Sequence, residues 1–142
     1  MDYKQIIRSI EKGDFSPVYL LHGEEPFFID AITDAIVKHA MDESERDFNQ
    51  TIVYGKETTV AALISDAKQF PMMGQRRLVV VREAQELKDI DELEVYFNNP
   101  LTSTVFVLAH KHKKFDSRKK SFKAAQKAGL VFLSEKVKDY KL

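Results

Sequence analysis

The chain has 142 residues, of which 44% are hydrophobic and 31% are charged. This length suits one domain with a single core, and the composition is that of a globular protein. Cysteine is absent, which excludes disulfide frameworks and thiolate metal sites. No stretch is apolar and long enough to cross a bilayer, and the first residues lack the apolar run of a secretory signal. We therefore expect one cytoplasmic domain with no membrane association.

The charge is unevenly distributed, although the chain as a whole has no net charge. Residues 110–127 contain eight Lys or Arg and one acid, so the rest of the chain carries a net charge of minus seven. The chain thus has one basic segment.

The first third of the chain predicts two helices around a strand. Asp2 is suited to cap a helix with Ile6 and Ile10 on one stripe, and Gly13 is suited to end it. The apolar run 18–21 predicts a strand, and Pro26 fits the first turn of a second helix that reaches about residue 41. The expected buried stripe of this helix is Phe28, Ile32, Ala35, Ile36 and Ala40.

The remaining chain repeats the alternation of strand and helix. After a polar connection at 42–47, strands are predicted at 51–54, 78–81, 104–108 and 130–133. Thr58 or Thr59 opens one helix, a second carries Ile90, Leu93 and Phe97, and the basic segment forms a third from Asp116 to Gly129. The pattern predicts an α/β domain with five mostly parallel strands, 78–81 inside the sheet, and helices on both faces.

The turn after the first strand resembles a damaged phosphate loop. A working loop, G-x-x-x-x-G-K-[ST], uses glycines to expose backbone N–H groups, a Lys for the outer phosphates and a hydroxyl for Mg²⁺. Only Gly23 is present, and the other three positions hold Phe28, Ile29 and Asp30. Glu24 and Glu25 add negative charge where phosphates would lie. We therefore expect no nucleotide hydrolysis here.

Other catalytic patterns are missing. The four histidines lack the i, i+4 spacing of a zinc helix, and no G-x-S-x-G elbow is present. We expect no intrinsic catalysis, no metal and no cofactor.

Residues 68–78 form an unusual segment that joins a helix to the central strand. Phe70, Met72 and Met73 lie beside Pro71 and Gly74, so they cannot all continue the buried stripe of the preceding helix. Exposed apolar residues on a rigid turn are typical of an anchor that inserts into a partner's pocket. The alternative is a loop folded back on the core.

Three segments resemble the delta subunit of the bacterial DNA polymerase III clamp loader, specifically its N-terminal domain. They are residues 18–28 (VYLLHGEEPFF), 70–81 (FPMMGQRRLVVV) and 114–120 (KFDSRKK). The resemblance covers nearly the whole chain. It implies a three-layer RecA/AAA+-like fold in which residues 1–142 are one P-loop-NTPase-like domain that binds no ATP. It also implies that the lid and collar domains of the family are absent and that the chain is a fragment.

The resemblance further implies that the domain binds and helps to open the β sliding clamp, and that the missing collar would contact the other loader subunits. The implied clamp-binding residues are Phe70, Pro71, Met72, Met73 and Gln75. Relatives more often have Phe or Leu-Phe where this chain has Met72 and Met73.

The basic segment leaves a second interaction open. Arg118, Lys119, Lys120 and Lys123 are candidates for contact with DNA or a partner, because clustered cations release counterions from phosphate. The alternatives are a solvated helix face and long-range steering toward an acidic clamp. Two other functions stay open: a divergent nucleotide-binding domain and a DNA-binding module built on the basic helix.

Overall fold

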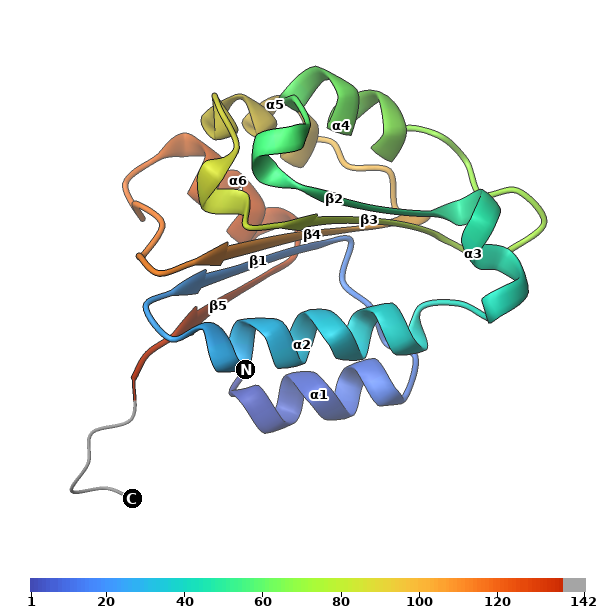
Figure 1. Ribbon diagram of the computed structural model, residues 1–142, viewed down its shortest axis with the longest axis horizontal. Helices are drawn as coiled ribbons and strands as arrows, with labels where there is room; N and C mark the ends of the chain where they lie inside the picture. Colours follow the sequence, from blue (N-terminus) through green and yellow to red (C-terminus); the bar gives the residue numbers. More distant parts are fainter. Residues whose placement is uncertain (137–142) are drawn as a thin grey trace.

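Five parallel strands form the centre of the fold in the order β2-β3-β4-β1-β5. The computed structural model describes residues 1–136 (Figure 1). The strands are β1 (Val18–Gly23), β2 (Gln50–Tyr54), β3 (Arg77–Arg82), β4 (Thr104–Lys111) and β5 (Leu130–Ser134). The predicted five-stranded sheet is confirmed, and its named strands are all parallel. β3 is an inner strand, as its unbroken apolar run predicted.

Helices cover both faces of the sheet, which makes three layers (Figure 1). The helices are α1 (Tyr3–Glu11), α2 (Pro26–His39), α3 (Glu43–Asn49), α4 (Val60–Ala67), α5 (Glu94–Phe97) and α6 (Lys120–Ala128), with 3₁₀ turns at Gly55–Glu57, Ala84–Glu86 and Ile90–Leu93. α1 and α2 pack on one face, and α4, α5 and α6 pack on the other. None of the helices within residues 1–136 has the length and apolarity to cross a membrane.

The two layers of the core follow from the alternation of side chains along each strand. Tyr19 and Leu21 of β1 pack toward α1 and α2, whereas Val18 and Leu20 pack toward α4, α5 and α6. Every residue of β1 is therefore buried, which explains why this strand reads as a continuous apolar run.

The predicted helix starts at Asp2 and Thr59 are confirmed. The Asp2 carboxylate accepts a hydrogen bond from the Gln5 N–H in a capping box, and Thr59 Oγ1 accepts one from the Ala62 N–H. Gly13 has a φ of +84°, as expected of the residue after a helix.

Several boundaries differ from the predictions. Residues 42–47 are largely helical in α3, because Glu43 and Glu45 complement the positive start of a helix that has no apolar periodicity. The buried stripe of α2 includes Ile29, whereas Phe28 and Ala35, which were predicted to be buried, are only partly buried. The predicted helix through residues 90–97 is a 3₁₀ turn followed by the single turn α5. The basic helix begins at Lys120, because Asp116 instead accepts the Arg118 N–H in a turn.

Candidate protein-docking site

The loop of residues 70–75 joins α4 to β3 at the amino end of the strands. The turn between β1 and α2 lies at the carboxyl end, because all five strands are parallel (Figure 1). The two sequence-predicted sites therefore lie at opposite ends of the sheet.

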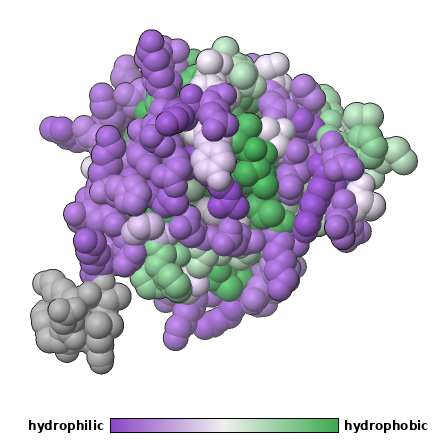
Figure 2. All heavy atoms as spheres, viewed as in Figure 1, coloured by the Kyte–Doolittle hydropathy of each residue, from purple (hydrophilic) through white to green (hydrophobic). Residues whose placement is uncertain are grey.

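Apolar side chains of the 70–75 loop lie on the surface. Met73 is 97% exposed, Phe70 is 72% exposed and Met72 is 58% exposed. Gln75 is also exposed, whereas Pro71 is partly buried. Figure 2 shows apolar side chains projecting at the end of the molecule where this loop lies in Figure 1. These side chains are accessible to a partner and are outside both core clusters.

A buried amide holds the backbone of this loop in place. The Asn49 side chain at the end of α3 has no exposed surface, and its Nδ2 donates to the Met72 carbonyl oxygen at 2.8 Å. The Met72 N–H donates to Asn49 Oδ1 at 2.7 Å. Met73 follows in the left-handed region with a φ of +57°, a conformation that a non-glycine residue keeps only when its surroundings enforce it. The tip of the loop is therefore held in one shape.

The far side of the loop is anchored by two arginines. Arg77 Nη1 donates to the Phe48 carbonyl oxygen at 3.0 Å, Arg77 Nε donates to the Asp66 carbonyl oxygen at 3.0 Å, and the guanidinium forms an ion pair with the Asp66 carboxylate. Arg76 Nη1 donates to the Ala40 carbonyl oxygen at 2.8 Å. These contacts tie the loop to α2, α3 and α4. Sequence reasoning missed Asn49 and Arg77, because no local pattern distinguishes a supporting polar residue from a solvated one.

The turn between β1 and α2 has little backbone available to a phosphate. Only Glu24 and Glu25 separate the strand from the helix, and Phe28 lies inside α2 rather than in a loop. The Gly23 N–H donates to the Lys113 carbonyl oxygen, and the Glu25 N–H donates to the Ser134 carbonyl oxygen at 3.4 Å. Pro26 has no N–H, and the Phe27 N–H donates to the Glu25 carboxylate at 3.1 Å.

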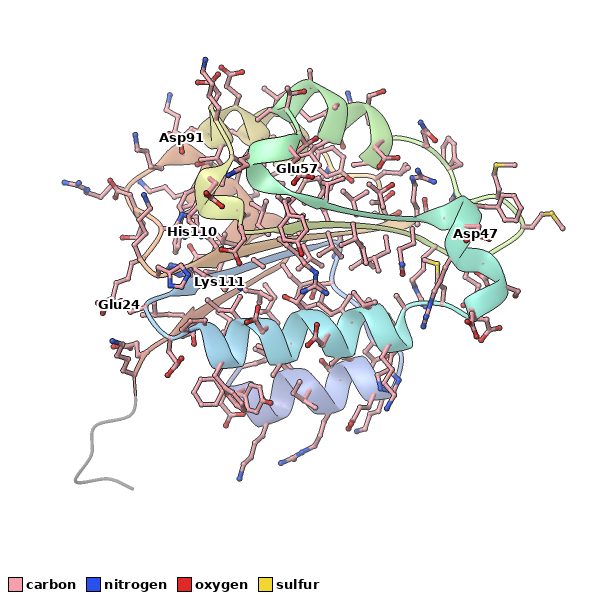
Figure 3. The ribbon with its side chains drawn as sticks, viewed as in Figure 1. Glu24, Asp47, Glu57, Asp91, His110 and Lys111 are labelled. Atoms are coloured by element: carbon pink, nitrogen blue, oxygen red, sulfur yellow. The ribbon has the colours of Figure 1, made fainter. Side chains whose placement is uncertain are left out.

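Asp30 is engaged by a lysine of the protein itself. Lys111 Nζ lies 3.0 Å from Asp30 Oδ1 and 2.6 Å from Glu83 Oε2. Burial alone would lower the pKa of Lys111, but these hydrogen bonds outweigh it and raise the pKa above its usual value. The hydrogen bond from Lys111 also lowers the pKa of Glu83. One ammonium group thus bridges two carboxylates at this end of the sheet and offsets one of their two negative charges. Figure 3 also places Glu24 and His110 at this end.

Two histidines near this turn are buried structural residues. His22 Nδ1 accepts a hydrogen bond from the Phe115 N–H at 2.9 Å, and burial lowers the pKa of His22 to about 4. Burial also lowers the pKa of His110. Both rings are therefore neutral at pH 7. Within residues 1–136, no group of three or more His, Asp or Glu side chains is arranged to hold a metal ion.

The four candidate basic residues, Arg118, Lys119, Lys120 and Lys123, are all exposed. Arg118 forms a two-pronged ion pair with Asp116, and its guanidinium lowers the pKa of that carboxyl group to about 2. Lys119 Nζ lies 3.4 Å from Asp91 Oδ2. Two of the four charges are thus partly balanced within the chain, and their contact with DNA stays a prediction.

Comparisons with known proteins concern the family and the fold of the chain. The sequence model of the family "DNA polymerase III, delta subunit" matches residues 19–135. The DNA polymerase III subunit delta of Bacillus subtilis is 35% identical over 130 residues, which cover 84% of this chain and 38% of that protein. The solved structure of the Bacillus subtilis DNA clamp loader delta protein superposes with a TM-score of 0.85 at 29% identity, over 99% of this chain and 44% of the other.

A more distant solved structure shares the fold. The DNA polymerase III gamma subunit-related protein of Thermotoga maritima superposes with a TM-score of 0.59 at 12% identity, over 99% of this chain and 48% of that chain. The chain therefore spans less than half the length of each of these relatives. The match of the family model over most of the sequence, together with the 35% identical relative, shows that the chain belongs to the DNA polymerase III delta subunit family.

Proposed function

We propose that this chain binds the ring-shaped β sliding clamp through Met72 and Met73, with Phe70, Pro71 and Gln75 at the border of the contact. The observation that carries the proposal is the exposure of two adjacent methionines on a loop whose backbone is held by Asn49. A relative with a similar structure is described as a clamp loader delta protein, which supports this choice of partner.

The ordered backbone of the exposed loop favours binding. Moving a large apolar side chain from water into an apolar pocket lowers the free energy, and methionine adapts to irregular pockets. Binding costs less when the backbone is already ordered, because less conformational entropy is lost. A fixed loop with an almost fully exposed Met73 is therefore suited to be an anchor.

Titration calorimetry with the sliding clamp from the same source tests this proposal. The double variant Met72→Ala, Met73→Ala is expected to bind at least about 30-fold more weakly, which corresponds to about 2 kcal/mol for a two-residue hot spot. Val95→Ala is the matched control, because Val95 is also an exposed apolar residue but lies on α5. Equal affinity of the parent and the double variant would show that the anchor is elsewhere.

The proposed role includes no binding of ATP by this chain. The N–H groups of Gly23, Glu25 and Phe27 already donate within the protein. Asp30, at the position of the metal-binding hydroxyl, shares the ammonium group of Lys111 with Glu83. Glu24 and Glu25 would repel a triphosphate. Titration with a fluorescent ATP analogue and Mg²⁺ is expected to give no saturation, and saturable micromolar binding would restore the alternative of a divergent nucleotide-binding domain.

Clamp opening requires no chemistry from this chain. A protein that binds an open ring more tightly than a closed ring shifts the ring toward opening by that difference in affinity. In this proposal ATP hydrolysis is the task of other loader subunits. The loader would work in the cytoplasm, where bacterial DNA is replicated. A clamp variant with a disrupted ring interface is expected to bind more tightly than the intact ring, and equal affinities would refute the opening role.

A further inference from the structure

The short helix α3 reverses the usual distribution of apolar and polar residues. Its only apolar side chain, Phe48, is 59% exposed, whereas Asn49 has no exposed surface. Buried polar groups and exposed apolar patches are the exceptions that call for an explanation. The burial of Asn49 is explained by its two hydrogen bonds to Met72. Phe48 belongs to neither core cluster, so its surroundings on the surface have to be considered.

Phe48 belongs to the same surface as the 70–75 loop. The side chain of its neighbour Asn49 forms hydrogen bonds of 2.7 and 2.8 Å with the backbone of Met72. The Cα atoms of Phe48 and Asn49 are about 3.8 Å apart, as in any two consecutive residues. The Phe48 carbonyl oxygen also accepts a hydrogen bond from Arg77, which follows the loop at the start of β3. Figure 3 shows the adjacent Asp47 at the end of the molecule where the loop lies. Phe48 is thus held near the two methionines by contacts of its own backbone and of the next residue.

Four of the large exposed apolar side chains therefore gather at this end of the sheet: Phe48, Phe70, Met72 and Met73. Exposed apolar residues scattered singly are ordinary on a monomer, whereas a contiguous group marks an interaction surface. The remaining residues of α3 are polar or charged, which matches the polar rim around the apolar centre of protein interfaces.

We propose that the clamp-docking surface is composite, with Phe48 of α3 as an additional apolar contact and Asn49 as the residue that positions the loop against it. This inference rests on the proposed function. It specifies the chemistry of the partner: an apolar pocket for the methionines with an adjoining apolar area that covers the Phe48 ring.

Calorimetry with Phe48→Ala tests the composite surface. Removing a contacting phenyl ring is expected to weaken clamp binding at least about fivefold. Phe27→Ala is the matched control, because Phe27 is also a highly exposed phenylalanine but lies at the start of α2, at the opposite end of the sheet. Its affinity for the clamp is expected to equal that of the parent.

The outcomes separate this inference from the proposed function. If Phe48→Ala binds within twofold of the parent while the double methionine variant loses affinity, the composite surface is wrong and the methionine anchor stands. If the double variant and Phe48→Ala both bind like the parent, both proposals fail.

Hydrogen exchange tests the positioning role of Asn49 without the clamp. In Asn49→Ala, the Met72 amide is expected to exchange faster while the buried Val80 amide of β3 is unchanged, and clamp binding is expected to weaken. Parent-like exchange at Met72 in Asn49→Ala would overturn the assignment. Where the Val80 amide also accelerates, the clamp affinity of Asn49→Asp decides instead, because this variant keeps the volume and the acceptor for the Met72 N–H but loses the donor to the Met72 carbonyl oxygen. Parent-like clamp affinity of Asn49→Asp would overturn the assignment.

Discussion

Replacing Gly23 by alanine tests whether the turn between β1 and α2 is closed by β5. Gly23 has a φ of +133°, and an added Cβ would lie 2.9 Å from the carbonyl carbon of Ser134 and nearer still to its oxygen. Gly13→Ala is the matched control, since Gly13 also has a positive φ, +84°, but nothing lies within 4 Å of an added Cβ. The comparison removes the backbone strain that the two sites share, and what remains is the collision with Ser134 together with any further strain at a φ of +133°.

The expected loss in the free energy of unfolding can be worked out for each of the two sites. Strain at a positive φ costs about 1 kcal/mol, which is the whole effect expected for Gly13→Ala. At Gly23 the Ser134 backbone must also move, which breaks the hydrogen bond of 2.6 Å from Ser134 Oγ to the Glu25 carbonyl oxygen and loosens its neighbours. Adding about 1 kcal/mol for this bond and a similar cost for repacking brings the Gly23→Ala loss to about 3 kcal/mol.

Urea unfolding followed by circular dichroism measures both variants, with the free energy of unfolding taken by linear extrapolation. Gly23→Ala is expected to be about 2 kcal/mol less stable than Gly13→Ala, or about 6 °C lower in Tm for a chain of this size. Equal stabilities of the two variants would show that the Ser134 backbone of β5 can move away at little cost in free energy. In that case the turn would not be closed to a phosphate.

Three further predictions concern buried polar groups. The pKa of His22 in the folded chain, about 4, lies below its usual value, so the unfolded chain takes up the proton first as pH falls. The folded state is therefore expected to lose up to about 3 kcal/mol of stability between about pH 6.5 and pH 4. Urea unfolding across this pH range should show a smaller loss for His22→Asn. Arg77→Met is expected to cost about 2–4 kcal/mol in the same assay at pH 7, because it leaves Asp66 without its cation, and a loss below about 1 kcal/mol would contradict this reasoning. Lys111→Met is expected to destabilise by about 1–2 kcal/mol at pH 7 and by less at pH 4, where Glu83 is closer to protonation; a pH-independent loss would point to packing instead.

The candidate docking surface was only partly predictable from sequence. Phe70, Met72 and Met73 were identified because Pro71 and Gly74 interrupt the helical stripe around them, and the structure places their side chains on the surface. Phe48 was missed, because a single aromatic residue in a polar segment has no period from which its exposure can be inferred. Their roles in clamp binding stay predictions.

The sequence by itself determined the alternation of strands and helices and the starts of α1 and α4. These features depend on apolar periodicity and on capping residues within a few positions of one another, so they are local. Helix α3 and the start of α6 were predicted wrongly, because they depend on charges and turns that carry little periodic signal.

Only the tertiary structure decided how the docking loop is held and how the phosphate-loop turn is closed. Asn49 and Met72 are 23 residues apart, and Ser134 and Glu25 are 109 residues apart. Lys111 and Asp30, 81 residues apart, likewise meet only because β4 pairs with β1 and α2 packs against the same sheet. A hydrogen bond or ion pair between distant residues depends on the path of the whole chain, which no local pattern encodes.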